Sequence, residues 1–178
     1  KKSGGVTISH LRFGKKTIKS TYLIEEADFI SCSTQAYVRQ YNLLKGLKKG
    51  GTFLLNTSWS EEELVVNLPA EMKNYLAKND INFYIINASK IAEEVGLGRR
   101  TNMIMQAAFF KLANVIPIDD AVKYLKDAIK NTYGRKGENI VKMNYDAVDR
   151  GMDALVKVKV PAEWKDIRDE AAAASNHE

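Results

Sequence analysis

The sequence predicts an α/β protein: one domain of three layers, α/β/α, with a mostly parallel central sheet and a helix-rich C-terminal half. Two observations predict this class. Short aromatic or β-branched runs alternate with helical patterns over the first half of the chain, as in sheets whose parallel strands are joined by helices. From residue 88 onwards, apolar residues recur at helical spacing almost throughout. The expected topology is therefore Rossmann-like.

Five segments have the composition of strands. Residues 6–9 alternate apolar and polar side chains, as one face of a sheet requires. Three further runs are short and aromatic or β-branched, with turn residues nearby: 29–32, 52–56 and 82–87. Residues 157–160 are a candidate last strand, which Pro161 ends.

The first expected helix covers residues 36–47. Tyr37, Tyr41 and Leu44 recur there at helical spacing, which predicts one apolar face. Gly50-Gly51 follows and is expected to end this segment, since glycine is common just beyond helix C-termini.

Local residue patterns predict where the next helices begin and end. Ser60 and Glu63 have the spacing of a capping box, in which each side chain bonds the other's backbone N–H. Pro69 can open the following helix, because a proline's missing N–H is not needed in a first turn. A further helix over residues 88–95 is expected to stop at Gly96.

The C-terminal half continues as helices. Residues 103–115 are apolar nearly all round, which predicts burial inside the protein or at a subunit contact. Residues 119–133 are amphipathic, with Val122, Leu125 and Ile129 at helical spacing, and 138–156 continue in the same style.

Composition excludes several classes of protein. The chain has 178 residues, of which 45% are hydrophobic and 28% charged, the balance of a folded soluble domain. A single cysteine, Cys32, forms no internal disulfide, and no Cys/His cluster suits zinc or an iron–sulfur cluster. No apolar run approaches the roughly 20 residues of a membrane span, and no secretory signal pattern is visible. No membrane association and a cytoplasmic location are expected.

The charge balance favours an anionic partner. Lysine and arginine total 27 against 22 acidic residues, a net charge of +5, which does not choose between nucleic acid and a phosphorylated small molecule. No nucleic-acid-binding motif is recognisable, so nucleic acid is not expected. The sequence shows no acid/base constellation, Ser–His pairing or thiamine-binding motif, so we assign no catalytic and no metal-ligating residue.

The most suggestive local chemistry is the run Gly96-Leu97-Gly98-Arg99-Arg100-Thr101-Asn102 ahead of the apolar helix. Glycines let a backbone approach a ligand closely, and a helix N-terminus attracts anions. The two arginines add positive charge, and Asn102 offers a donor and an acceptor. The alternative is structural: Gly96 ends one helix, and Thr101 caps the next.

Three other positions raise the same choice between a binding role and a structural role. Asn144 stands within a helical pattern, where asparagine is unfavourable. Its side chain therefore either packs against another part of the protein or binds a ligand. The turn 134–137 is basic and could hold an anion, but Gly134 could simply end a helix. Cys32, within an apolar strand, is expected to be a buried hydrophobe.

Four ordered stretches of the chain resemble pyruvate:ferredoxin (flavodoxin) oxidoreductases. They begin Gly4-Gly5-Val6-Thr7-Ile8-Ser9-His10, Gly50-Gly51-Thr52-Phe53, Thr101-Asn102-Met103-Ile104-Met105-Gln106 and Lys130-Asn131-Thr132-Tyr133-Gly134-Arg135. The resemblance extends over roughly residues 1–165. It identifies the chain as the gamma-type catalytic domain of the single-chain enzymes, called domain III or the coenzyme A (CoA)-binding domain.

The resemblance implies an oxidoreductase of anaerobic metabolism. Such enzymes convert pyruvate and CoA to acetyl-CoA and carbon dioxide, with reduction of ferredoxin or flavodoxin. Thiamine diphosphate, magnesium and 4Fe-4S clusters are implied in other domains of the same polypeptide, and the full-length enzyme is implied to be a homodimer. The excised domain is expected to be inactive.

The resemblance also implies three CoA contacts. They are Lys1, just before the Ser-Gly-Gly stretch, Asn102, which opens the helix at 102–110, and Asn144, which precedes the Tyr-Asp-Ala-Val-Asp stretch. A glycine-rich Gly-Ser-Asp-Gly-Thr turn precedes this region in the family and is missing here. Residues 1–160 are therefore expected to form the domain without its N-terminal strand, turn and helix, and 161–178 a linker towards the next domain. The alternative function is a structural module for assembly of a related 2-oxoacid oxidoreductase.

Overall fold

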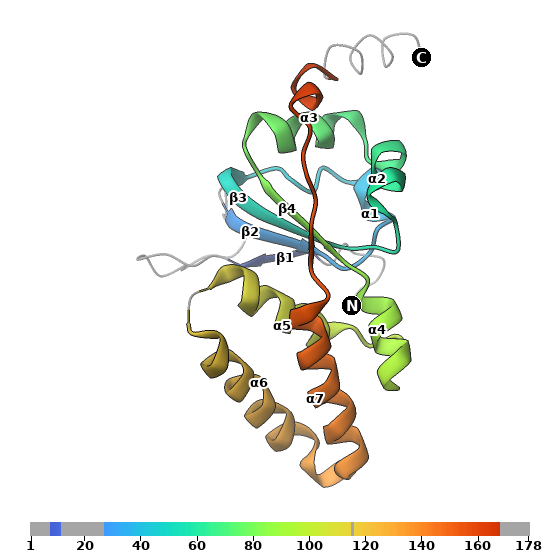
Figure 1. Cartoon of the computed structure of the whole chain (residues 1–178), viewed down its shortest axis with the longest axis vertical. Helices are drawn as coiled ribbons and strands as arrows, with labels where there is room; N and C mark the ends of the chain where they lie inside the picture. Colours follow the sequence, from blue (N-terminus) through green and yellow to red (C-terminus); the bar gives the residue numbers. More distant parts are fainter. Residues whose placement is uncertain (1–7, 12–26, 115, 168–178) are drawn as a thin grey trace. The chain divides into compact units, whose positions relative to one another are not determined.

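The computed structural model describes residues 8–11, 27–114 and 116–167 (Figure 1). The chain divides into two compact units. We call the first the sheet unit; its described residues are 8–11, 27–55, 59–84 and 157–167. We call the second the helical unit; its described residues are 56–58, 85–114 and 116–156.

The strands form a five-stranded sheet in the order β1-β2-β3-β4-β5. Their bounds are β1 Ile8–Leu11, β2 Ala27–Cys32, β3 Leu47–Asn56, β4 Asn82–Ile86 and β5 Val156–Lys157. β1 is antiparallel to β2, and β2 is parallel to β3 with Ile30 opposite Phe53. The strands predicted at 29–32, 52–56 and 82–87 are thus confirmed, except that β4 ends one residue earlier, at Ile86. The strand predicted at 6–9 overlaps β1, but residues 6 and 7 lie outside the described residues.

The last strand is shorter than predicted. β5 contains only Val156–Lys157, although the Val158 N–H still donates to the Phe83 carbonyl at 2.9 Å. The segment that follows β5 leads to the short 3-10 helix η3 (Ala162–Asp166), which packs on helix α3 (Figure 1).

The helix predicted over residues 36–47 is wrong beyond its first turn. Helix α1 contains only Tyr37–Gln40, because Tyr41 is extended with φ −137° and ψ 154°. Gly46 then adopts a positive φ of 86°, and its carbonyl accepts the Ala27 N–H at 2.7 Å, which draws the chain into β3. The helical spacing of Tyr37 and Tyr41 instead supports an edge-to-face ring contact at 5.4 Å.

Gly50 and Gly51 do not end a helix; they lie inside β3. Gly50 has a φ of +80°, and a Cβ on Gly51 would lie 2.8 Å from Leu47 Cδ1 and 3.0 Å from the Asp28 carbonyl oxygen. The register between β2 and β3 shifts at the same level of the sheet, between Ala27 and Phe29. The two glycines therefore permit an irregularity of the strand, a role that glycine often has in sheets.

The remaining helices follow the predicted order. They are α2 Glu61–Asn67, α3 Ala70–Lys78, α4 Ala88–Val95, α5 Asn102–Ala113, α6 Ile118–Tyr133 and α7 Glu138–Asp153, with the 3-10 turn η2 at Gly134–Lys136. The capping box is confirmed: Ser60 Oγ accepts the Glu63 N–H at 3.2 Å, and Glu63 Oε1 accepts the Ser60 N–H at 3.1 Å. The predicted α/β class, with a mostly parallel sheet and a helix-rich C-terminal half, is confirmed.

Each unit has an apolar core of its own. In the sheet unit, the Phe53 and Phe83 rings are fully buried and stacked with centroids 5.5 Å apart. In the helical unit, a cluster from α5, α6 and α7 is buried: Ala107, Ala121, Leu125, Ile129, Val148 and Met152. The described helices are each too short or too polar to cross a membrane.

Cys32 is a buried thiol, as predicted. Its side chain is fully buried, its Sγ–H donates to the Thr34 carbonyl at 3.1 Å, and burial raises the pKa of the thiol. We therefore expect iodoacetamide at pH 8 to alkylate Cys32 far more slowly in the folded chain than in urea, measured by mass spectrometry. Because the pKa is raised, the stability that the neutral thiol contributes is present below the unfolded pKa and is lost as pH rises through the folded pKa. Rapid stoichiometric labelling of the folded chain would contradict this prediction.

Candidate anion-binding site

The turn between α4 and α5 starts with a structural glycine. Gly96 ends α4 with a φ of +96°, and the Leu97 N–H reaches back to the Ala92 carbonyl at 2.7 Å. This pattern is a Schellman motif, completed by the buried side chain of Leu97. A Cβ on Gly96 would lie 3.2 Å from the side chain of Met143 on α7. The structural alternative for Gly96 is thus confirmed, and the turn lies directly against α7.

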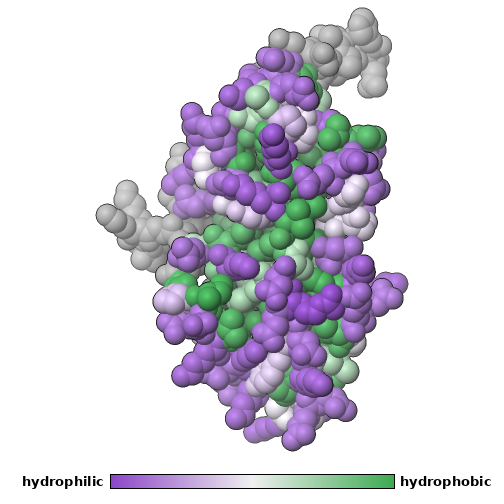
Figure 2. Space-filling model, viewed as in Figure 1, coloured by the Kyte–Doolittle hydropathy of each residue, from purple (hydrophilic) through white to green (hydrophobic). Residues whose placement is uncertain are grey.

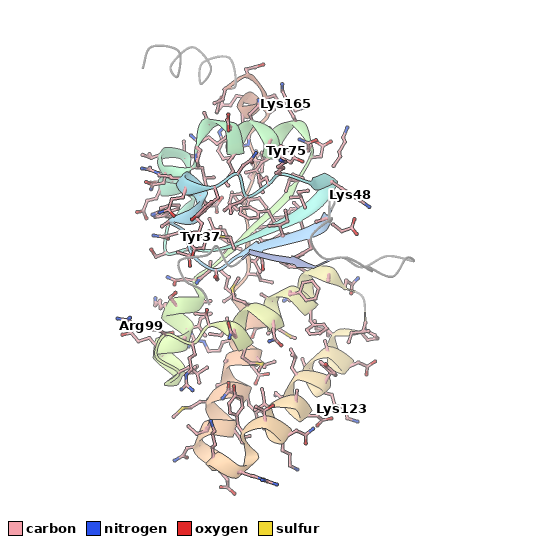
Figure 3. The ribbon with its side chains drawn as sticks, turned by 180° about the vertical axis from the view of Figure 1, so that it is seen from behind. Tyr37, Lys48, Tyr75, Arg99, Lys123 and Lys165 are labelled. Carbon is pink, nitrogen blue, oxygen red and sulfur yellow. The ribbon has the colours of Figure 1, made fainter. Side chains whose placement is uncertain are left out.

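The rest of this turn is open and positively charged. Gly98 has a φ of +64° with nothing within 4 Å of its Cβ position. Arg99 and Arg100 are exposed; Arg100 Nε donates to the Leu97 carbonyl at 3.2 Å, and Arg99 points away from the ribbon (Figure 3). The two arginines thus directly precede the N-cap residue of α5 in the chain, and both side chains are exposed.

The N-terminus of α5 carries no compensating negative charge. Thr101 occupies the predicted N-cap position, but its side chain makes no capping hydrogen bond, and the first turn contains no acidic residue. Asn102, the first residue of α5, is exposed. A helix N-terminus presents backbone N–H groups and about half a unit of positive charge. Together with the arginines, this terminus is electropositive.

Asn144 lies on α7 and is only 5% exposed. Its Nδ2 donates to the Ile140 carbonyl at 2.8 Å, one turn earlier in the helix. No donor among the described residues reaches its Oδ1 in a hydrogen bond. A buried amide oxygen without a partner is costly, so Asn144 is a binding candidate rather than an ordinary helix residue.

Helices α5 and α7, which carry the two asparagines, pack directly on each other. A Cβ on Gly151 of α7 would lie 2.7 Å from the Ile104 carbonyl oxygen of α5, so the two backbones are almost in contact. Lys111 Nζ of α5 donates to the Met152 carbonyl at 2.7 Å. The structure thus brings Asn102 and Asn144 onto adjacent helices. Lys1, the third predicted contact, lies outside the described residues.

Sequence reasoning missed the buried polar side chain of Asn56, at the carboxyl end of β3. It is 5% exposed, its Oδ1 accepts the Ala88 N–H at 2.8 Å, and its Nδ2 donates to Ser89 Oγ at 3.2 Å. These bonds hold the first turn of α4. Only the position of a polar residue at the end of an apolar strand could have indicated this role.

Replacing Asn56 by alanine would leave the Ala88 N–H buried without its acceptor. We expect a loss of about 1–3 kcal/mol in the free energy of unfolding, measured with urea. Asn56→Asp keeps the acceptor and places negative charge at a helix N-terminus, so a smaller loss is expected. An alanine variant as stable as the parent chain would contradict this role.

The polar groups of this region are mainly hydrogen-bond donors and positive charges. They include amide groups, backbone N–H groups and guanidinium groups, all suited to an anion. Across the described ranges of the chain, no three His, Cys, Asp or Glu side chains gather closely enough to hold a metal ion. At the turn 134–137 the structural alternative is confirmed: Gly134 is the C-cap of α6, with a helical φ of −54°, and the 3-10 turn η2 with Arg135 and Lys136 follows.

The fold of this chain is also found in a solved protein structure, and a family model matches most of its sequence. Subunit PORC of pyruvate oxidoreductase from Thermotoga maritima has the same fold, with a TM-score of 0.60 and 16% identity, covering 76% of this chain and 67% of that chain. The family described as pyruvate ferredoxin/flavodoxin oxidoreductase matches residues 1–154. The chain belongs to this family.

Two curated relatives show how much of such a protein the chain represents. Pyruvate:ferredoxin oxidoreductase of Moorella thermoacetica is 59% identical over all 178 residues, which are 15% of that protein. Pyruvate-flavodoxin oxidoreductase of Enterobacter agglomerans is 60% identical over 173 residues, covering 97% of this chain and 15% of that protein. The chain thus spans about a seventh of the length of these relatives.

Proposed function

We propose that this chain is the CoA-binding domain of a cytoplasmic pyruvate:ferredoxin or flavodoxin oxidoreductase. The observation that carries the proposal is the electropositive N-terminus of α5, opened by Asn102 and packed beside the helix of Asn144. CoA carries several phosphates, which the helix N-terminus and Arg99 and Arg100 suit. Asn144 has an acceptor available for a ligand donor. Residues 1–160 form the domain in this proposal, and 161–178 lead to the next.

The whole protein would convert pyruvate, CoA and an oxidised electron carrier to acetyl-CoA, carbon dioxide and the reduced carrier. The names of the relatives support pyruvate and ferredoxin or flavodoxin. One cysteine cannot supply the four thiolates of a 4Fe-4S cluster, so this chain does not fit that cofactor. We therefore place the clusters, thiamine diphosphate and magnesium in other domains of a homodimeric protein. The contribution of this chain is to bind and orient CoA.

Calorimetric titration of CoA tests this role. We expect Asn102→Ala and Asn144→Ala each to raise the dissociation constant about tenfold, the loss of roughly one hydrogen bond to a charged or buried group. Asn139→Ala is the matched control, because Asn139 is exposed on the same helix α7 and should leave affinity unchanged. Thermal unfolding of each variant shows whether a loss of CoA affinity is caused by a loss of folded structure.

The second candidate is a structural module that assembles a related 2-oxoacid oxidoreductase. The close contact of α5 and α7 at Gly151 favours a rigid support. This alternative predicts that Asn102→Ala changes assembly with the rest of the protein but not CoA affinity. Equal CoA affinity for the parent, Asn102→Ala and Asn144→Ala chains would overturn CoA binding at these residues.

A further inference from the structure

The sheet unit contains a hollow that the proposed CoA site does not use. It lies between the C-terminal end of α3, the start of β4 and the segment 157–165, and has a volume of about 410 Å³. Small-molecule sites in proteins usually have volumes of about 300–1,000 Å³. The hollow is therefore large enough for a small organic ligand.

The hollow has a strong excess of positive charge. Lys157, Lys159 and Lys165 line it, and all three are exposed; Figure 3 shows Lys165 on η3. Within the described part of the chain, none of these three lysines forms an ion pair. The single carboxylate in the lining, Asp80, is paired with Lys49 at 3.9 Å. The lining of this hollow thus carries three ammonium-bearing side chains against one carboxylate.

The walls that present these lysines are fixed by hydrogen bonds. Buried Asn74 of α3 donates from Nδ2 to the Lys165 carbonyl at 2.7 Å, and the Val158 N–H donates to the Phe83 carbonyl at 2.9 Å. At the end of α3, the Leu76 carbonyl already accepts the Ile81 N–H at 3.1 Å. This carbonyl is therefore satisfied and does not need the lysines as partners.

The lining also contains apolar side chains beside the charged ones. It includes Leu76, Ile81, Val158 and Val160, and the visible face of the sheet unit shows apolar areas between hydrophilic ones (Figure 2). The ammonium group of Lys157 lies 6.0 Å from the centre of the Tyr84 ring. A lining that combines apolar side chains with a few charges suits an organic ligand better than a simple ion.

We propose that this hollow binds a small organic phosphate, with the phosphate at Lys159 and Lys165 and the organic part on the apolar lining. Lysine ammonium groups are compact point charges that suit phosphate oxygens. The ligand class follows from the combination of three unpaired lysines and apolar walls. The proposal is independent of CoA binding in the helical unit, since the two sites share no described residue.

The test is an NMR titration of the ¹⁵N-labelled chain with phenyl phosphate, inorganic phosphate and phenol. Phenyl phosphate should shift the amide signals of Ile81 and Val158 saturably and bind more tightly than either of its parts. A Lys159→Gln/Lys165→Gln variant should bind it about tenfold more weakly. The control is Lys130→Gln/Lys142→Gln, which removes the same charge from exposed positions on α6 and α7.

Two results would overturn the proposal. Equal weakening by the two double variants would mean that net charge alone attracts the ligand. If inorganic phosphate bound as tightly as phenyl phosphate, the apolar lining would contribute nothing to binding. Neither result would bear on CoA binding, which is measured at Asn102 and Asn144.

Discussion

Gly151→Val is expected to destabilise the chain by about 3 kcal/mol, because overpacking a well-packed contact costs 1–3 kcal/mol or occasionally more. A Cβ on Gly151 would lie 2.7 Å from the Ile104 carbonyl oxygen and 3.2 Å from Ala107 Cβ. The obstacle is backbone, so no side-chain rotation relieves it. Helices α5 and α7 would have to separate. Urea unfolding of the variant measures the loss.

The matched control for this substitution is Gly134→Ala. Gly134 has a helical φ of −54° and open space around its Cβ position. Alanine there is expected to leave stability unchanged or to raise it by up to about 1 kcal/mol, since the unfolded chain loses freedom. A Gly151→Val variant as stable as the Gly134→Ala variant would contradict the close approach of α5 and α7.

Phe83→Ala is expected to cost about 3–5 kcal/mol, the usual range for a buried phenylalanine. Phe83 is fully buried in β4 and stacks on Phe53 of β3, so its removal opens a cavity and also ends a ring contact. Many domains have a total stability of only 5–15 kcal/mol, so the variant would be close to unfolding. Circular dichroism during urea titration measures this effect.

Tyr124→Ala is the control for Phe83→Ala. Tyr124 is an aromatic residue of α6 that is 60% exposed, so its removal is expected to change stability far less. Phe83→Leu, which keeps most of the buried volume, should fall between the two. A Phe83→Ala chain as stable as the Tyr124→Ala chain would contradict the core of the sheet unit.

Features that depend on neighbouring residues were predictable from the sequence. The capping box at Ser60 and Glu63 needs only two side chains three positions apart, and Gly96 ends α4 through bonds to its own last turn. The amphipathic spacing of Leu125 and Ile129 likewise indicated which face of α6 is buried. Local chemistry determines each of these structures.

Features that depend on distant contacts were not predictable. Residues 36–47 have helical spacing, but the pairing of Ala27 with Gly46 draws the chain into β3. Gly51 is required because the Asp28 carbonyl passes close to it, and Gly151 because the Ile104 carbonyl does. These close approaches depend on how separate segments pack against each other. The pattern of residues within one segment therefore cannot predict them.

The candidate site was predictable in part. The run from Gly96 to Asn102 indicated an exposed, basic turn before a helix, and the structure has it. The burial of Asn144 and its bond to the Ile140 carbonyl depend on the packing of α7, which the sequence did not reveal. The expected capping bond of Thr101 is absent, which leaves more of the α5 N-terminus available to a ligand.

The most direct measurement of CoA binding is an NMR titration of the ¹⁵N-labelled chain with CoA. CoA bound as proposed would shift, in one saturable process, the first-turn amides of α5 at residues 102–104 and the side-chain amide of Asn144. The titration should reach about 10 mM, so that even millimolar affinity is detected. Saturable shifts confined to other parts of the folded chain, or no shift at all, would contradict CoA binding at this site.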